Sequence, residues 1–380
     1  AVSFTIAETL ANYIAYNQGV QFQFIAADSA CGGPNIVTAS AQSLVDAGVW
    51  GVVGAACSGA SKAANEVFKE AGIPMISYAS TAAVLSDDAI HPLFWRVVSS
   101  DIEQSNALAD VAEANGHAGS MAIVMAQDLY TAGIASDFKA AIEAKGHTIC
   151  SEVSYDRSTT TTFADTVSDL QTNSCGAVAV FAYNSDGASI LEQLSTDGYT
   201  GQVYGSDGIA SVTLADALSD NTPINGVIAS NPGAPSWVPS ADANPVQSVF
   251  PALWAQYAYA PVQVDSGVDS DGDGVNETTT VVVAVPMGQF ATSAFDASVI
   301  MALSAFAFLA GQGTVTAAQA IQSTGQNFNG ASGTLTFQAN GDVAGSGYCI
   351  GTFTATVDTV SFDCNQAWVN GVISDQPASA

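Results

Sequence analysis

The feature that most constrains the fold is a repeated alternation of strand-like and helix-like segments along most of the chain. Apolar runs such as WGVVGA at 50–55 and MAIVMA at 121–126 are typical of buried strands, and segments with apolar residues at helical spacing follow them. Strands joined by helices of this length predict parallel sheets covered on both faces. The expected strands lie at 21–27, 50–55, 74–78, 93–98, 121–126, 147–155, 177–183, 201–206 and 226–230.

The number of such units exceeds what one sheet usually holds. We therefore expect an α/β protein with two doubly wound parallel-sheet lobes. Breaks are predicted near Gly116–Gly119 and in the Pro/Ser/Ala-rich segment 231–245. No stretch reaches the roughly 18–20 uninterrupted apolar residues that span a bilayer, which indicates a soluble globular protein.

The charge distribution excludes whole classes of partner. The net charge is -29, and all six Lys and Arg residues precede position 158. Phosphate backbones and anionic membranes require clustered basic residues, so we expect neither nucleic acid nor electrostatic membrane docking. Charged residues are only 11% of the chain, so the acidity comes from missing bases. Salt screens such a surface, which fits a saline, extracellular setting; an acidic lineage bias is the alternative.

The six cysteines fit the same compartment. Their even number, without any C-x-x-C spacing, is typical of disulfides rather than of zinc or redox chemistry. Other connectivities stay open, but the cysteines fall into three pairs that are local in sequence. The expected bridges are Cys31–Cys57, Cys150–Cys175 and Cys349–Cys364. A cleaved leader or a membrane tether would have to lie outside the given sequence.

Catalytic patterns are missing from the sequence. The residues around Ser58 do not form a G-x-S-x-G nucleophile elbow, and His91, His117 and His147 lie in unrelated predicted positions. Neither a Walker sequence nor a dinucleotide fingerprint occurs. We expect a protein that is not an enzyme.

The order of the elements and several short motifs resemble the type I periplasmic binding proteins of the leucine/isoleucine/valine-binding family. The strongest section is DAGVWGVVGAACSGASKAANEVFKEAGIPMISYASTAAVLSD at 46–87, followed by FWRVVSSD at 94–101. MAIVMAQDLYTAGIASDFKAAIEAKG at 121–146, GSDGIAS at 205–211 and SGTLTFQANGDVAG at 332–345 continue it. The resemblance covers nearly the whole chain and implies the family's fold of two doubly wound parallel-sheet lobes with a ligand cleft between them. The lobes that it implies are 1–117 with 236–330, and 118–235 with 331–380.

One departure concerns the start of the chain. Family members begin with a strand and a turn before the first helix, whereas this sequence begins inside that helix. The missing strand would sit centrally in the sheet of the first lobe. Either residues precede Ala1 in the native protein, which we favour, or something else fills that position.

Doubly wound lobes bind ligands beyond the carboxyl ends of their strands, where helix N-termini present N–H groups. Ser58 and Gly59 start a helix directly after such a strand, and Ala79 and Thr81 occupy the next turn, so these residues are candidates for holding a carboxylate; the alternative is that Ser58 and Thr81 are helix N-caps. The resemblance favours the binding role. It also implies that an acidic residue pairs with the ligand ammonium and that aromatic rings cover the ligand. The matching positions are Asp207, with Asp186 as a second acidic candidate, and Tyr130 and Tyr183; turn and packing roles are the alternatives.

The acidic loop VDSGVDSDGDGVNETT at 264–279 follows the pattern of a calcium loop, in which Gly274 allows the sharp turn. Position 12 is Thr280 instead of the usual Glu, so we expect a weak site or one completed from elsewhere. A solvated acidic turn is the alternative. Since the loop looks like an insertion relative to the family, we assign its Ca²⁺ a structural role. The expected ligands are Asp269, Asp271, Asp273, the carbonyl of Val275, and Glu277.

The resemblance implies an extracytoplasmic solute-binding protein that captures an amino acid, or a similar small amphipathic ligand, for the permease of an ABC importer. A second hypothesis is a cell-surface structural or adhesive protein, or a filament subunit, that reuses the fold. A third is a ligand-sensing ectodomain. The sequence alone does not distinguish the ligand or the partner.

Overall fold

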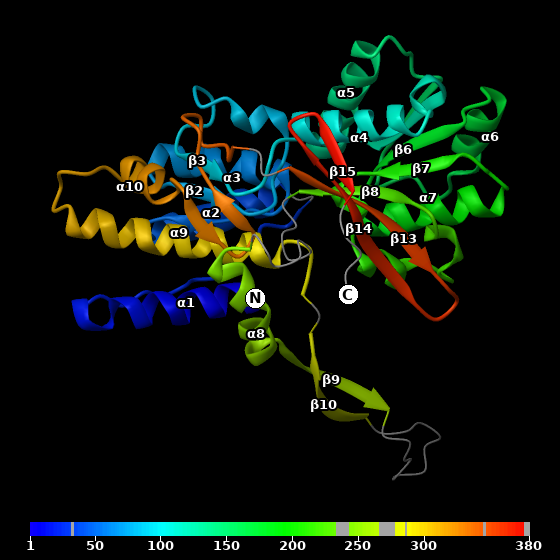
Figure 1. The fold of residues 1–380 in the computed structure, drawn as a ribbon. Coiled ribbons are helices and arrows are strands. Elements are labelled where there is room, and N and C mark those ends of the chain that lie inside the picture. Colours follow the sequence, from blue (N-terminus) through cyan, green and yellow to red (C-terminus); the bar gives the residue numbers. More distant parts are fainter. Residues whose placement is uncertain (32–33, 233–242, 266–277, 286, 345–346, 376–380) are drawn as a thin grey trace.

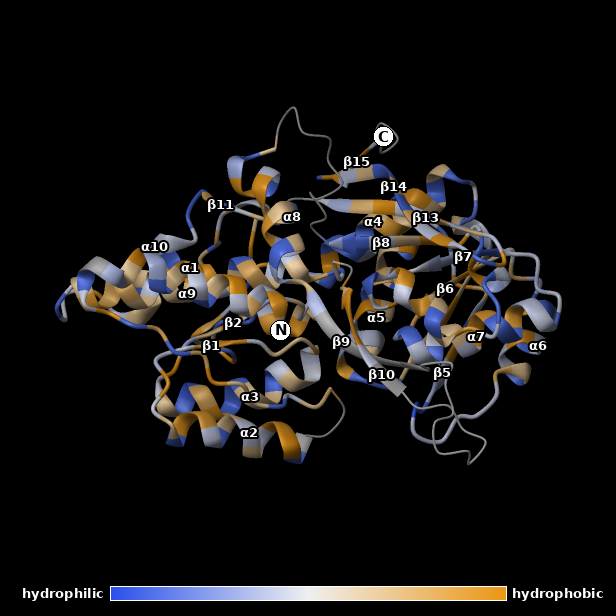
Figure 2. Ribbon diagram, turned by 90° about the horizontal axis from the view of Figure 1, so that it is seen from below, coloured by the Kyte–Doolittle hydropathy of each residue, from blue (hydrophilic) through white to orange (hydrophobic). Residues whose placement is uncertain are grey.

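The computed structural model describes residues 1–31, 34–232, 243–265, 278–285, 287–344 and 347–375, and it shows two lobes side by side (Figure 1). Each lobe has its own sheet with helices on both faces. The predicted fold class is therefore confirmed. Seen from below, the N-terminal residue lies between the two lobes (Figure 2).

The second lobe is built on an eight-stranded sheet. Five strands run parallel, and the last three form an antiparallel extension beside β8. In sheet order the strands are β15 (Val372–Asp375), β14 (Val360–Val369), β13 (Tyr348–Ala355), β8 (Ile228–Pro232), β7 (Gln202–Gly205), β6 (Ala177–Phe181), β4 (Met121–Ala126) and β5 (Ser151–Tyr155).

Side-chain alternation along these strands separates two cores. Ile123 packs on one face with the helices α4 (Asp101–Ala114) and α5 (Leu129–Ala144). Val124, its neighbour, packs on the other face with α6 (Ala164–Thr172) and α7 (Asn184–Thr196). Both faces are covered, which explains why β4 and β6 are continuous apolar runs.

The first lobe has a parallel sheet of β1 (Val52–Val53), β2 (Met75–Ser77) and β3 (Phe94–Arg96). One face of this sheet packs on α2 (Pro34–Asp46) and α3 (Ser58–Ala71). The other face packs on α9 (Ala291–Ala310), and α1 (Val2–Ala15) lies against α9. Among the described residues α9 is long and apolar enough to cross a membrane, yet 67% of its apolar stretch is buried, as expected of a core helix. The remaining elements of this lobe are α8 (Pro245–Tyr257), α10 (Ala317–Thr324), β11 (Phe328–Gly330) and β12 (Gly333–Leu335).

The strand predicted at 21–27 does not form. This segment is held instead by side chains of α1, because Phe22 exchanges two hydrogen bonds with Asn12 and the Phe24 N–H donates to Glu8. A cavity of about 520 Å³ separates residues 22–29 from residues 47–55. A strand needs a neighbour for its ladder, and none of the described strands pairs with this segment.

Packing differs from the sequence expectation at two of the three lobe boundaries, and the third, at 235–236, lies outside the described residues. Helix α4 belongs with the second lobe, since it packs on α5 and Gln104 donates to the carbonyl of Ser230 at 3.2 Å. The chain therefore crosses before α4, and the glycines near 116–119 form a helix–strand turn inside the lobe. At the other end, Phe337 and Val343 still pack in the first lobe with Ile300. The second lobe resumes at β13.

Three disulfides and one hairpin complete the description of the fold. The bridges Cys31–Cys57, Cys150–Cys175 and Cys349–Cys364 confirm the predicted pairing. After α8 the chain forms an antiparallel hairpin of β9 (Tyr259–Asp265) and β10 (Thr278–Ala284), which the sequence analysis did not foresee. Figure 1 shows this hairpin standing away from the body of the molecule.

A buried arginine joins distant parts of the first lobe. The Arg96 side chain is fully buried, and its Nε donates to Asp342 Oδ1 at 2.7 Å. Its Nη1 donates to the carbonyls of Ser80 and Ala82, and its Nη2 to the Ser86 hydroxyl. One guanidinium thus holds the turn after β2 to the chain segment that leads back to the second lobe.

We expect Arg96→Met to lower the free energy of unfolding by about 3–5 kcal/mol, because it leaves Asp342 and two buried carbonyls without their donor. Urea denaturation at pH 7 measures this loss. The control is Lys139→Met, which removes an exposed ion pair with Glu152 and should leave the midpoint unchanged. Equal midpoints for both variants would show that Arg96 is not a structural anchor.

Candidate functional site

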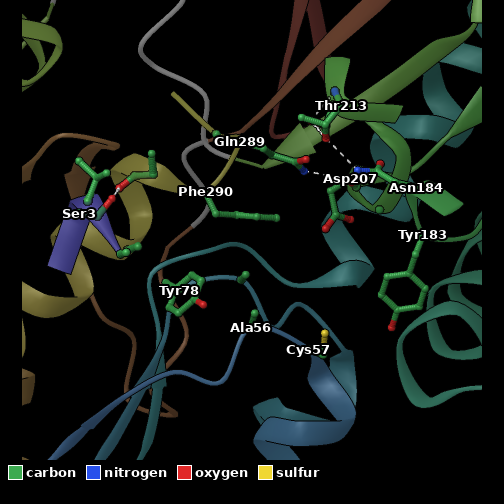
Figure 3. Close-up of a pocket in the computed structure, with 18 of the residues that line it drawn as sticks. Ser3, Ala56, Cys57, Tyr78, Tyr183, Asn184, Asp207, Thr213, Gln289 and Phe290 are labelled. Atoms are coloured by element: carbon green, nitrogen blue, oxygen red, sulfur yellow. Dashed lines mark hydrogen bonds between the residues drawn. The ribbon is translucent and has the colours of Figure 1, made fainter. Parts of the chain in front are cut away.

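A cavity of about 690 Å³ lies between the lobes, at the carboxyl ends of their parallel strands (Figure 3). Ser58 and Ala79 face it from the first lobe, and Tyr130, Tyr183 and Asp207 face it from the second. Five of the seven predicted ligand residues therefore meet in one place. The rule that parallel strands collect binding residues at this edge explains why.

On the first-lobe side the site is the start of α3. Ser58 begins this helix and lines the cavity, and the N-cap Cys57 provides no side-chain cap, so the first-turn N–H groups have neither intrahelical partners nor a capping side chain. The Ser58 hydroxyl accepts a hydrogen bond from the Ala82 N–H at 3.2 Å, which ties the helix to the neighbouring turn. This end suits a carboxylate.

The turn after β2 differs in detail from the expectation. The Ala79 N–H donates to the Ser77 hydroxyl at 3.3 Å, so this N–H already has a partner inside the lobe. Thr81 is buried behind the cavity wall, and Gly59 is exposed beside it; neither lines the cavity. Ser58 is thus the strongest of the four first-lobe candidates.

On the second-lobe side Asp207 is held in place by Tyr130. The Tyr130 hydroxyl donates to Asp207 Oδ1 at 2.7 Å, lies 2.8 Å from the Ser206 hydroxyl, and accepts the Gly208 N–H at 2.9 Å. Burial raises the pKa of Asp207 to about 6, and the hydrogen bonds from Tyr130 and Gln104 oppose this rise. A buried carboxylate that faces the cavity favours a cationic group on a ligand.

A second buried acid, Asp101, lies near Asp207, and the sequence analysis did not identify it. Asp101 is fully buried at the start of α4, and its N–H donates to the carbonyl of Thr81 at 2.8 Å. Burial, and then the negative charge of Asp207, raise the pKa of Asp101 well above its usual range. No cation pairs with Asp101 within the described parts of the chain. Its position after Ser100, an N-cap, was the available signal, but that pattern is equally typical of an ordinary helix start.

The ring of Tyr183 forms another wall. It lies 5.5 Å from the ring of Tyr130, and the guanidinium of Arg157 sits 4.1 Å from its centroid. Asp186, the alternative acidic candidate, accepts hydrogen bonds from Arg157 and Tyr155 and does not line the cavity. It therefore supports Tyr183 through Arg157 instead of facing a ligand.

Aromatic side chains close the opposite end of the cavity. These residues come from α1, from the turn after β2, from α8 and from the segment before α9. Because they are distant in sequence, no local pattern predicted that they would meet. Tyr78 and Phe290 lie on this side in Figure 3. The four side chains are Phe4, Tyr78, Trp254 and Phe290.

No lysine or arginine is among the described residues that line the cavity, and Asp207 is its charged member. Three of the four lysines are on two helices, Lys62 and Lys69 on α3 and Lys139 on α5, and Lys145 directly follows α5. The predicted calcium ligands between 269 and 277 lie outside the described residues.

Comparisons with known proteins agree with this geometry. The family described as "Receptor family ligand binding region" matches residues 1–355. The Leu/Ile/Val-binding protein of Escherichia coli K12 is 25% identical over 265 residues, which cover 67% of this chain and 70% of that protein. Metabotropic glutamate receptor 4 of Mus musculus is 30% identical over 184 residues, 47% of this chain but only 20% of the receptor.

Solved structures show the same fold. A leucine-binding protein from Thermotoga maritima superposes with a TM-score of 0.71 at 19% identity, covering 99% of this chain and 94% of the other. A substrate-binding protein of an ABC transporter from Desulfitobacterium hafniense, in complex with Leu, has a TM-score of 0.67 at 20% identity and covers 94% and 95%. These are binding proteins, not enzymes. The chain belongs to the receptor family of ligand-binding regions and has the fold of the type I periplasmic binding proteins.

Proposed function

We propose that this protein is an extracytoplasmic solute-binding protein that closes around an amino acid with an apolar side chain and delivers it to an ABC importer. The observation that carries the proposal is the arrangement of opposite polarities across one cavity: the uncapped start of α3 at Ser58 on one lobe and the buried carboxylate of Asp207 on the other. A zwitterion fits this arrangement.

The remaining walls support the choice of side chain. Beyond the polar groups the cavity is bounded by Phe4, Tyr78, Trp254 and Phe290, which suits an apolar or aromatic side chain. A second carboxylate on the ligand would face this apolar end without a cationic side chain to pair with. We therefore expect acidic amino acids to be excluded.

The partner and the compartment rest on the relatives and on the disulfides. The name of the Desulfitobacterium hafniense structure describes a substrate-binding protein of an ABC transporter, and three disulfides suit an oxidising compartment. The net charge of -29 supports our proposal of a saline setting. A ligand-sensing ectodomain is the second candidate, which the match to the mouse receptor favours. Co-isolation of a permease with the protein would distinguish the importer from the sensor.

We also propose a structural calcium ion in the acidic loop, on the strength of its D-x-D-x-D-G pattern. The hairpin supports this, because the β9–β10 register pairs Asp265 with Thr278 and so closes the loop at its base. Millimolar calcium should raise the melting temperature, and Asp271→Asn should abolish the rise. Magnesium serves as the control, and equal effects of both ions would point to charge screening instead of a site.

Asp207→Ala should abolish binding of amino acids, because it strands a desolvated ammonium at a cost of about 2–5 kcal/mol. For the unchanged protein, ligand at 100 times its dissociation constant should add about 2.7 kcal/mol of stability. Thermal unfolding with a panel of amino acids measures both. Asp88→Ala, at an exposed position, is the control. Normal binding by Asp207→Ala would contradict the amino-acid assignment. Failure of every small molecule to stabilise the unchanged protein would favour the structural or adhesive alternative.

Affinity for amino acids should fall as the pH is lowered through about 6. Burial raises the pKa of Asp207 in the unliganded protein to about 6, whereas a bound ammonium requires the ionised carboxylate. Below that pH the ligand must displace a proton, which costs up to about tenfold in affinity for each pH unit. Calorimetric titrations between pH 5 and pH 8 test this. A flat profile for the unchanged protein would show that Asp207 does not pair with the ammonium.

A further inference from the structure

One side chain of the first lobe reaches across the cavity to the acidic residue of the second. Gln289 Nε2 donates a hydrogen bond to the backbone carbonyl of Asp207 at 2.7 Å. Figure 3 shows this bond beside the cavity, with Gln289 directly before Phe290. Gln289 and Asp207 both line the cavity between the lobes, so the bond lies where a ligand would be enclosed.

The first-lobe end of this contact is rigidly held. The Ala291 N–H donates to the carbonyl of Gly288 at 3.0 Å, and the Ala291 carbonyl accepts the Ser3 hydroxyl at 2.7 Å. Upstream, the Val285 N–H donates to the carbonyl of Ala258, and Trp254 Nε1 donates to the carbonyl of Val285. The segment that carries Gln289 is therefore fixed to α8, α1 and the start of α9.

The second-lobe end is equally well defined. The Asp207 carbonyl also accepts the Ala210 N–H at 3.2 Å, which closes the 3₁₀ turn Asp207–Ile209. The same turn directs the Asp207 carboxylate toward Tyr130. Gln289 thus holds the backbone of the residue whose side chain faces the ligand.

We propose that Gln289 is a closing latch that stabilises the closed form of the cleft and positions Asp207 for the ligand. The inference rests on the proposed function. Separation of the lobes would break the bond, since its donor and acceptor sit on different lobes, so the bond favours the closed state alone. A net hydrogen bond of this kind should change the closed-to-open ratio by about 2- to 12-fold.

The test compares Gln289→Met, which keeps the length of the side chain without its donor, with Gln289→Glu, which places a carboxylate against the Asp207 carbonyl. The probes are L-leucine and L-phenylalanine, with dissociation rates from stopped-flow fluorescence and lobe closure from small-angle scattering. Dissociation should be about 2- to 12-fold faster in Gln289→Met and faster still in Gln289→Glu, and the unliganded ensemble should become more open. The matched control is Gln171→Met, which removes a glutamine-to-carbonyl bond inside the second lobe, to Asp197 at 2.9 Å, and should change neither quantity.

An unchanged dissociation rate together with unchanged closure would overturn the latch. Weaker binding without any change in closure would also overturn it, because Gln289 would then be a direct ligand contact. If the unchanged protein binds neither probe, the proposed function fails, and scattering from the unliganded proteins still decides: equal radii of gyration for Gln289→Met and the unchanged protein refute the latch. Melting temperatures of all variants exclude unfolding as the cause.

Discussion

The binding edge of the first lobe depends on a cation buried beneath it. Arg96 gathers the carbonyls of Ser80 and Ala82 and the carboxylate of Asp342 around one guanidinium. The planar, forked donor set of arginine suits this task, which a lysine could not perform at the same time at several acceptors. The turn that presents Ala79, and through Ala82 the start of α3, is built on this contact. The geometry of the cleft is thus set by a residue that does not line it.

The site itself uses electrostatics without a cationic side chain. On one lobe, backbone N–H groups at the start of α3 supply positive potential. On the other, the buried carboxylate of Asp207 supplies negative charge, with the second buried acid Asp101 near it. Like charges in a dry site oppose joint ionisation. A positive group bound beside Asp207 would therefore favour the ionised carboxylates. An acidic protein with few basic residues can in this way recognise a zwitterion and still reject anions.

Much of the fold and of the candidate site could be predicted from the sequence, because strand and helix periodicities, strand-end positions and cysteine spacing are local signals. They predicted the sheets and the three disulfides, and the resemblance to the family added the meeting of Ser58 with Asp207. The failures share a physical cause: each depends on a partner distant in sequence. Residues 21–27 have a strand pattern but no adjacent strand, and α4 is apolar on the face that packs against the second lobe. Asp101 and Gln289 acquire meaning only when the lobes come together.

The placement of the lysines has a practical consequence. All four belong to α3 or to α5 and its end, and these helices contact each other across the boundary between the lobes. Amine-directed chemistry therefore acts on both lobes. Coupling the protein to a surface through its lysines would fasten both lobes and restrict their relative motion, whereas an amine-reactive crosslinker between α3 and α5 would report on the distance between them.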